Sequence, residues 1–329
     1  FRRVLFRSRM YPTQFGFPPS SNSVLVPTPY MGVLSNYDYF DSIPFPFISC
    51  SFDPQYEMLW CSTQNGFLRG YSLSNLHLQC SVEVIPNRCI YNMQSTQIGQ
   101  ITVTEYGMNI YNQGGMLRGK IGYEMPESGH YRAGFADIDD STTLLSLVGD
   151  FEGVYTFDIV SGKKKKRLFQ DQGSCVYSSS AGSVIGTTNG NIVFMDPRMN
   201  KCLDSLNAFL MTTQQVVRIG NYVVSLGIDY VSKKSLGVPN SIIKVFDART
   251  LDILPYSHRF QPSITSLRVV DEPSDSFLVS DLHGDCAFYS LLNGLVETQQ
   301  YQLHNADGEM VSSVALSSTH QLLAGVSLM

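Results

Sequence analysis

The sequence is poor in charge and has none of the long hydrophobic runs that mark membrane proteins. Charged residues make up 16% of its 329 positions, against about 25% in an average soluble protein. No apolar run approaches the ~18 residues that a membrane-spanning helix needs, so we expect no membrane partner. The net charge of -5 argues against a protein that coats nucleic acid along its whole surface, but it permits a local basic patch.

Catalytic and metal-binding motifs are also missing. The 7 cysteines include no CxxC pair and the 6 histidines form no HExxH pair, so neither a zinc site nor a disulfide framework is expected. P-loop, GxGxxG and GxSxG motifs are absent as well. Asp137, Asp139 and Asp140 lie between two expected strands, where a turn with local hydrogen bonds accounts for them. The sequence therefore predicts no metal and no cofactor.

What the sequence does contain is a repeat. Each unit has two apolar runs, then a turn, then a third run that ends in an aromatic or apolar residue followed by a polar one. The turns carry glycines at intervals of 41, 46, 37 and 94 residues, which are Gly66, Gly107, Gly153, Gly190 and Gly284. A period of about 40–45 residues with four short strands per unit is typical of a β-propeller. We predict an all-β, seven-bladed WD-type β-propeller with a truncated last blade and almost no helix. The third unit is expected at 131–170 and the fourth at 174–208, as separate blades.

The chain divides into three parts of different composition. Residues 1–9 are basic and fit poorly with the residues after them, so we expect a foreign leader there. Residues 10–47 are rich in Pro, Ser, Tyr and Asn, which predicts an extended arm with one edge strand at 23–26 or 31–34. Residues 48–329 form the expected propeller, which stops within its last repeat.

Two segments are candidates for binding. One is a dense basic run after the turn Ser161-Gly162, and the other is a long insertion at 229–240, since loops of this length often carry function. The basic run is interpreted first as a solvated outer-edge strand whose lysines discourage pairing. A phosphate-contacting patch and a nuclear-import signal are the alternatives. The candidate binding residues in the two segments are Lys163, Lys164, Lys165, Lys166, Arg167, Lys233 and Lys234.

Several blocks of residues point to one family. Glu57-Met58-Leu59-Trp60 followed by Asn65-Gly66 is similar to the first propeller repeat of the poly(A)-nuclease deadenylation complex catalytic subunit. The block 243–251, which reads Ile-Lys-Val-Phe-Asp-Ala-Arg-Thr-Leu, resembles the fifth repeat of that family. The segment 280–289 also fits. The resemblance spans about residues 40–329 and is to the N-terminal WD-repeat propeller of that subunit.

The resemblance implies a longer parent protein with parts outside this chain. These are a linker for a pseudokinase-like regulatory subunit, an inactive ubiquitin-hydrolase-like domain and a metal-dependent 3′-to-5′ exonuclease. The segment itself would then be a scaffold and not an enzyme. It would help to engage poly(A) through the poly(A)-bound coat protein, with contact to poly(A) RNA at most indirect. The implied location is cytoplasmic, including P-bodies, with the nucleus left open.

The repeats depart from the ordinary WD pattern. They lack a Gly-His pair in the usual role, and Phe-Asp, Met-Asp or Tyr replaces the terminal Trp-Asp. We therefore expect apolar packing between blades to be the main stabiliser. Two other functions are considered. A generic WD-repeat scaffold, such as a trafficking or ubiquitin-ligase adaptor, fits the same pattern. A propeller enzyme with a site in the central channel is disfavoured, because no His, Asp or Glu residues converge at strand starts.

Overall fold

The structure, a computed structural model, consists of β-strands joined by turns. It describes residues 3–9, 29–35, 47–74, 77–104, 106–122, 134–137, 144–149, 151–158, 161, 163–179, 182–195, 202–229, 240–250, 252–260, 264–270, 275–292, 294–302, 310–317 and 323–328. These segments contain no helix, which confirms the all-β prediction. Accordingly, none of them supplies a helix of the length and apolarity needed to cross a membrane.

The strands are short and follow one another as antiparallel meanders. In chain order they are β1 (Arg3–Arg9), β2 (Pro29–Ser35), β3 (Phe47–Phe52), β4 (Met58–Thr63), β5 (Phe67–Ser72), β6 (Leu78–Glu83), β7 (Asn92–Thr96), β8 (Gly99–Thr104), β9 (Gly107–Tyr111), β10 (Leu117–Gly122), β11 (Gly134–Asp137), β12 (Leu144–Gly149), β13 (Phe151–Asp158), β14 (Lys164–Ser179), β15 (Gly182–Thr187), β16 (Asn191–Met195), β17 (Cys202–Asn207), β18 (Thr213–Ile219), β19 (Tyr222–Asp229), β20 (Asn240–Asp247), β21 (Ile253–Phe260), β22 (Ile264–Val270), β23 (Ser276–Asp281), β24 (Asp285–Ser290), β25 (Val296–Gln302), β26 (Met310–Leu316) and β27 (Leu323–Leu328).

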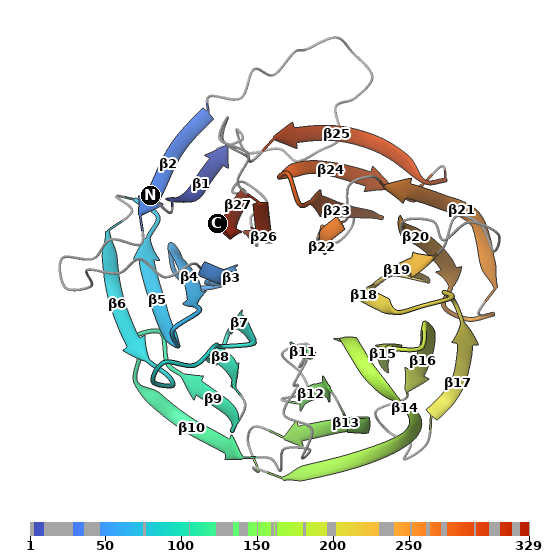
Figure 1. Ribbon diagram of the computed structural model, residues 1–329, viewed down its shortest axis with the longest axis horizontal. Coiled ribbons are helices and arrows are strands. Elements are labelled where there is room, and N and C mark those ends of the chain that lie inside the picture. Colours follow the sequence, from blue (N-terminus) through green and yellow to red (C-terminus); the bar gives the residue numbers. More distant parts are fainter. Residues whose placement is uncertain are drawn as a thin grey trace.

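The sheets stand radially around a central axis, which is the arrangement of a β-propeller (Figure 1). Residues of the inner strands line a channel along this axis. Four-stranded sheets are formed by β3–β6, β7–β10, β18–β21 and β22–β25. The first strand of each sheet lies nearest the channel and the last lies on the outside of the ring (Figure 1). Strand β26 contacts both β22 and β3, and it thereby closes the ring.

The number of sheets differs from the prediction. The described residues form five sheets of four or more strands and two two-stranded sheets, rather than seven blades with a truncated last one. The main cause is β14, a continuous strand of 16 residues. Its first half pairs with β13 and its second half with β15, so the repeats expected to be separate third and fourth blades merge into one seven-stranded sheet, β11–β17.

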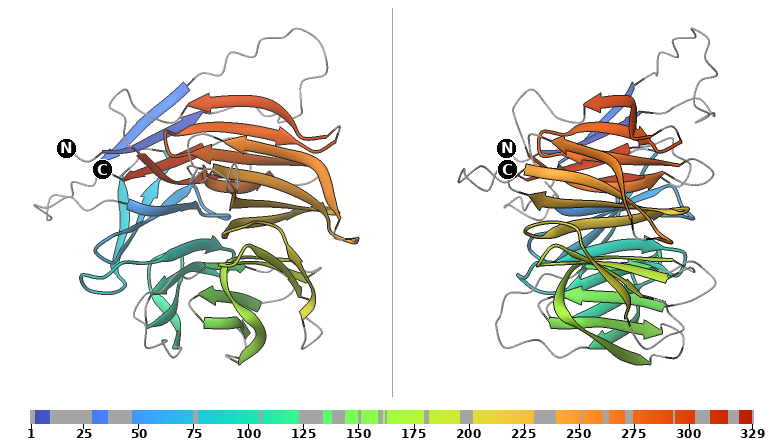
Figure 2. Two further views of the ribbon diagram at one scale, coloured as in Figure 1. Left: turned by 45° about the vertical axis from the view of Figure 1, so that its right-hand side comes forward. Right: turned by 90° about the vertical axis from the view of Figure 1, so that its right-hand side faces the viewer.

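Two hairpins remain as two-stranded sheets. One is β26–β27 and the other is β1–β2, and β1 lies beside β27 (Figure 2). Strand β1 lies within residues 1–9, the expected foreign leader, and β2 lies within the expected arm at 10–47. Of the two edge strands considered for that arm, β2 covers the one at 31–34.

The predicted turn glycines have backbone conformations that require glycine. All five have positive φ, and the values at Gly66 and Gly190 are 90° and 81°. Each of these two glycines ends a Thr-x-Asn-Gly hairpin whose threonine Oγ1 accepts the first amide of the next strand, at 2.9 Å in one case and 3.0 Å in the other. Each glycine carbonyl also accepts two amides from the connection to the next sheet. A Cβ on Gly66 would lie 1.8 Å from the carbonyl oxygen of Ile85, so no other residue fits that turn.

The hydrophobic core lies between neighbouring sheets. Ile243 and Val245 of β20 pack on one side with residues of β22–β24, whereas Ile242 and Phe246 of the same strand pack on the other side with residues of β15 and β16. Such a strand is buried on both faces, as in a stack of sheets. Apolar packing therefore joins neighbouring sheets, and a polar residue on either face needs a partner.

Candidate functional site

The predicted basic run occupies the start of β14. Lys163 precedes the strand and Lys165 lies within it, and both side chains are exposed. Lys164 to Arg167 pair only with β13 on the outside of the ring. This placement agrees with an outer-edge strand, although a role in binding stays a prediction. Lys233 and Lys234, the other candidate residues, lie outside the described residues.

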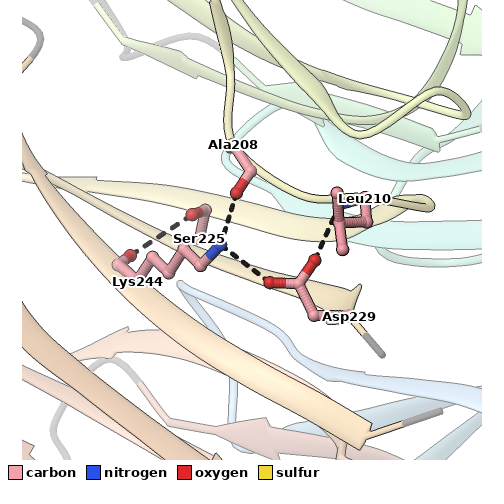
Figure 3. Close-up of polar contacts among 5 residues, drawn as sticks. All are labelled: Ala208, Leu210, Ser225, Asp229 and Lys244. Carbon is pink, nitrogen blue, oxygen red and sulfur yellow. Dashed lines mark hydrogen bonds and ion pairs between the residues drawn. The ribbon is translucent and has the colours of Figure 1, made fainter. Parts of the chain in front are cut away.

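The base of the long insertion is held by an ion pair (Figure 3). Asp229 ends β19 and Asn240 begins β20, so the insertion leaves the sheet at Asp229. Lys244 of β20 places Nζ 2.8 Å from Oδ2 of Asp229. The other carboxylate oxygen, Oδ1, accepts the amide of Leu210 at 2.6 Å. The carboxylate therefore ties the insertion both to its own sheet and to the connection from the preceding sheet.

Lys244 is satisfied on all sides. Besides Asp229, its Nζ donates to the carbonyl oxygen of Ala208 at 2.6 Å and lies 4.7 Å from the centroid of the Phe209 ring. Such a cation–π contact adds about 0.5–2 kcal/mol, depending on desolvation. Beside this buried cluster Leu210 is 61% exposed. The arrangement anchors the end of β19 to β20 and to the connection that precedes β18, beside one exposed apolar side chain.

Sequence reasoning found the insertion but missed this cluster. The signal was present, because Lys244 alternates with Ile242 and Phe246 and so lies on a buried face of β20. A charge at such a position demands a partner. The sequence could not show which residue is that partner, because Asp229 lies on another strand, on the far side of the insertion from Lys244.

The central channel is a second candidate. It encloses about 730 Å³ and is lined by residues of β3, β7, β14, β18, β22 and β26. Side chains join neighbouring inner strands here. Gln215 of β18 donates to the carbonyl of Thr265 at 3.0 Å and accepts the amide of Leu267 at 2.5 Å, both on β22. Arg268 of β22 donates to the carbonyl of Val314 on β26 at 3.2 Å.

The described residues show no catalytic constellation. No group of three or more His, Cys, Asp or Glu able to hold a metal occurs among them. All seven cysteines are free. Burial raises the pKa of the Cys50 and Cys175 thiols, which line the channel, from 9.0 to about 12. Both thiols are therefore protonated at neutral pH and poor nucleophiles.

Comparison with solved structures places the fold among WD40 β-propellers. The chain superimposes on the Pan2 WD40 domain of Neurospora crassa with a TM-score of 0.69 and 18% identity, over 86% of this chain and 88% of that one. U3-55K gives a TM-score of 0.68 at 11% identity, covering 88% of this chain and 97% of its own. The WD40 repeats of RRP9 give 0.68 at 13% identity, with coverages of 87% and 89%. At these identities the likeness establishes the fold alone.

Comparison of sequences distinguishes among WD40 proteins better than comparison of folds does. No model of a known protein family matches the chain. The chain is 22% identical over 247 residues to the PAN2-PAN3 deadenylation complex catalytic subunit pan2 of Schizosaccharomyces pombe, a match that covers 71% of this chain. It spans only 22% of the length of that relative. The resemblance seen in the residue blocks, to the propeller of this subunit, is thus confirmed.

Proposed function

We propose that this chain is the scaffold and recognition propeller of an mRNA deadenylation subunit, whose exonuclease lies elsewhere in the parent protein. The sequence match to pan2 carries the proposal. The fold alone would not, because U3-55K and RRP9 superimpose nearly as well as the Pan2 domain. The propeller contributes no catalysis and needs no cofactor in this proposal.

The partners in this proposal are the pseudokinase-like regulatory subunit and the poly(A)-bound coat protein. A ring of stacked sheets suits that task, because its loops are held in fixed relative positions by the buried strands. The base of the insertion is anchored by the ion pair of Asp229 with Lys244 and by one further hydrogen bond from each side chain. The basic run is exposed at Lys163 and Lys165, where phosphates can reach it from solvent. The complex would act in the cytoplasm, including P-bodies.

The test uses the parent protein assembled with its regulatory subunit. Deadenylation is followed on naked poly(A) RNA and on poly(A) bound by its coat protein, with and without the propeller. We expect removal of the propeller to slow shortening of the coated substrate severalfold and to leave the naked substrate unaffected. Equal rates on the coated substrate would refute the recognition role.

A charge-reversal variant tests the basic run separately. In Lys163→Glu/Lys165→Glu, any RNA association of the propeller should weaken and depend less steeply on salt, since each lost phosphate contact lowers the slope of log K against log salt by about 0.9 for a duplex and 0.7 for a single strand. Arg249→Glu is a control, because Arg249 is exposed and lies in the turn between β20 and β21. Unchanged RNA binding would mean that these lysines only discourage pairing at the edge of an outer strand.

Purification of the parent protein with trafficking or ubiquitin-ligase components, and without deadenylation subunits, would favour the alternative function of a generic WD-repeat scaffold.

A further inference from the structure

The central channel has a polar lining contributed by several strands. The hydroxyl and amide side chains that line it include Ser51, Gln94, Ser174, Gln215, Thr265 and Ser313. Its volume of about 730 Å³ falls within the range of roughly 300–1,000 Å³ that is usual for small-molecule sites. The channel is therefore large enough for a small ligand and rich in neutral hydrogen-bonding groups.

Arg268 brings a positive charge into this channel. The side chain lines the channel and is open to solvent, although it starts from an innermost strand. Its Nε–H donates to the carbonyl oxygen of Val314 at 3.2 Å, which fixes the guanidinium between β22 and β26. Among the described residues its terminal nitrogens have no hydrogen-bond or ion-pair partner. The packing around Arg268 lowers its pKa from 12.5, but an arginine stays protonated in proteins.

No described residue of the lining neutralises this charge. The described lining contains no Asp, Glu, Lys or His, so Arg268 is its one permanently charged residue. The Cys50 thiol, which interacts electrostatically with Arg268, is held in its neutral form by burial, which raises its pKa to about 12. A fixed positive charge between protein walls of low dielectric attracts small anions.

We propose that the central channel binds a small phosphate-bearing ligand through the guanidinium of Arg268. The free N–H groups of a guanidinium match two oxygens of a phosphate. A phosphate has further oxygens, and the hydroxyl of Ser51 on the inner strand β3 can donate to one of them, because it accepts the Ser95 amide and keeps its own proton. A carboxylate has two oxygens, which the guanidinium alone would satisfy. The site uses only the interior of the ring, so it is independent of the role in deadenylation.

The test is calorimetric titration of the 329-residue chain in phosphate-free buffer. Inorganic phosphate and adenosine 5′-monophosphate serve as probes, and acetate is the carboxylate control. We expect saturable binding of both phosphate probes, weakening as salt rises, and binding of acetate at least tenfold weaker. Arg268→Gln should weaken phosphate binding at least tenfold, since a charge-assisted hydrogen bond is lost.

Arg218→Gln is the matched control. Arg218 also donates from Nε to a backbone carbonyl, that of Gly220, at 3.2 Å, but it does not line the channel. This variant should bind phosphate as the unmodified chain does. Arg268→Lys keeps the charge without the planar fork and should bind with intermediate affinity, which guards against a folding defect in Arg268→Gln. The proposal is overturned if the unmodified chain shows no saturable phosphate binding, if Arg268→Gln binds equally well, or if acetate binds as tightly as phosphate.

Discussion

Replacing Lys244 by methionine tests whether the ion pair anchors the insertion. Methionine keeps most of the apolar stem and its packing. It removes the donor to the Asp229 carboxylate at 2.8 Å and the donor to the Ala208 carbonyl at 2.6 Å. The Asp229 carboxylate would then keep the Leu210 amide, which donates to it at 2.6 Å. A partly buried negative charge is left without its cation.

The magnitude follows from how deeply the pair is buried. Breaking a fully buried pair costs about 3–5 kcal/mol. Here the side chains of Lys244 and Asp229 remain 20% and 12% exposed, so water screens part of the exposed charge. We expect Lys244→Met to lower the free energy of unfolding by about 2–3 kcal/mol. Part of this loss is the cation–π contact with Phe209.

The assay is urea unfolding followed by the fluorescence of Trp60, the one tryptophan of the chain, whose side chain is fully buried. Hydrogen exchange of the Leu210 amide provides a local readout and should speed up in the variant. Arg249→Met is the control, because Arg249 is 71% exposed and lies 3.5 Å from Asp247. It should leave stability unchanged. If Lys244→Met behaves like this control in both measurements, the anchoring role is refuted.

Three further predictions concern other parts of the ring. Trp60→Phe should lower the free energy of unfolding by about 2 kcal/mol, because it leaves a gap in the core and removes a hydrogen bond to Asp53. Thermal unfolding followed by circular dichroism measures this, and a change smaller than the experimental error would contradict the prediction. Gly190→Ala should destabilise by at least ~2 kcal/mol, because φ is 81° and the new Cβ would lie 2.3 Å from the carbonyl oxygen of Phe209; an unaltered urea midpoint would show that the turn relaxes. Cys175, whose pKa burial raises to about 12, should resist iodoacetamide at pH 8 until urea unfolds the chain. Since the folded pKa is the higher one, its contribution to stability should be lost between about pH 9 and 12, and rapid alkylation of the native thiol at pH 8 would argue against its burial.

The strands were predictable where a turn signal separates alternating apolar residues. Asn65-Gly66 marks the hairpin between β4 and β5, and Asn189-Gly190 marks that between β15 and β16. Between the third and fourth units the sequence 170–173 carries no Asn-Gly or Pro to force a turn. There β14 passes from one unit to the next without a break, so the separate blades expected from the repeat period merge into one sheet.

The candidate sites were less predictable, because their partners come from distant strands. The pattern of β20 showed a charge on a buried face, but Asp229 and the Phe209 ring reach Lys244 only in the folded ring. Arg268 lies in an otherwise apolar and polar-neutral strand, and its place in the channel depends on which strand of each sheet is innermost. The length of the sequence repeat indicates how many strands each unit has. Which side chains approach one another across the channel depends instead on the radius of the folded ring.

Hydrogen bonds between neighbouring sheets add to the apolar packing that is predicted to be the main stabiliser. Oδ2 of Asp53 accepts Trp60 Nε1 at 3.2 Å and Gln100 Nε2 at 2.9 Å, which joins the first sheet to the second. Gln215 joins β18 to β22, and Arg268 joins β22 to β26. Asp53 and Gln100 are buried, so a local break of the bond between them leaves a buried polar group unsatisfied. The ring therefore resists opening through directional bonds as well as buried area, and they fix the register of the inner strands in a way that apolar contacts alone cannot.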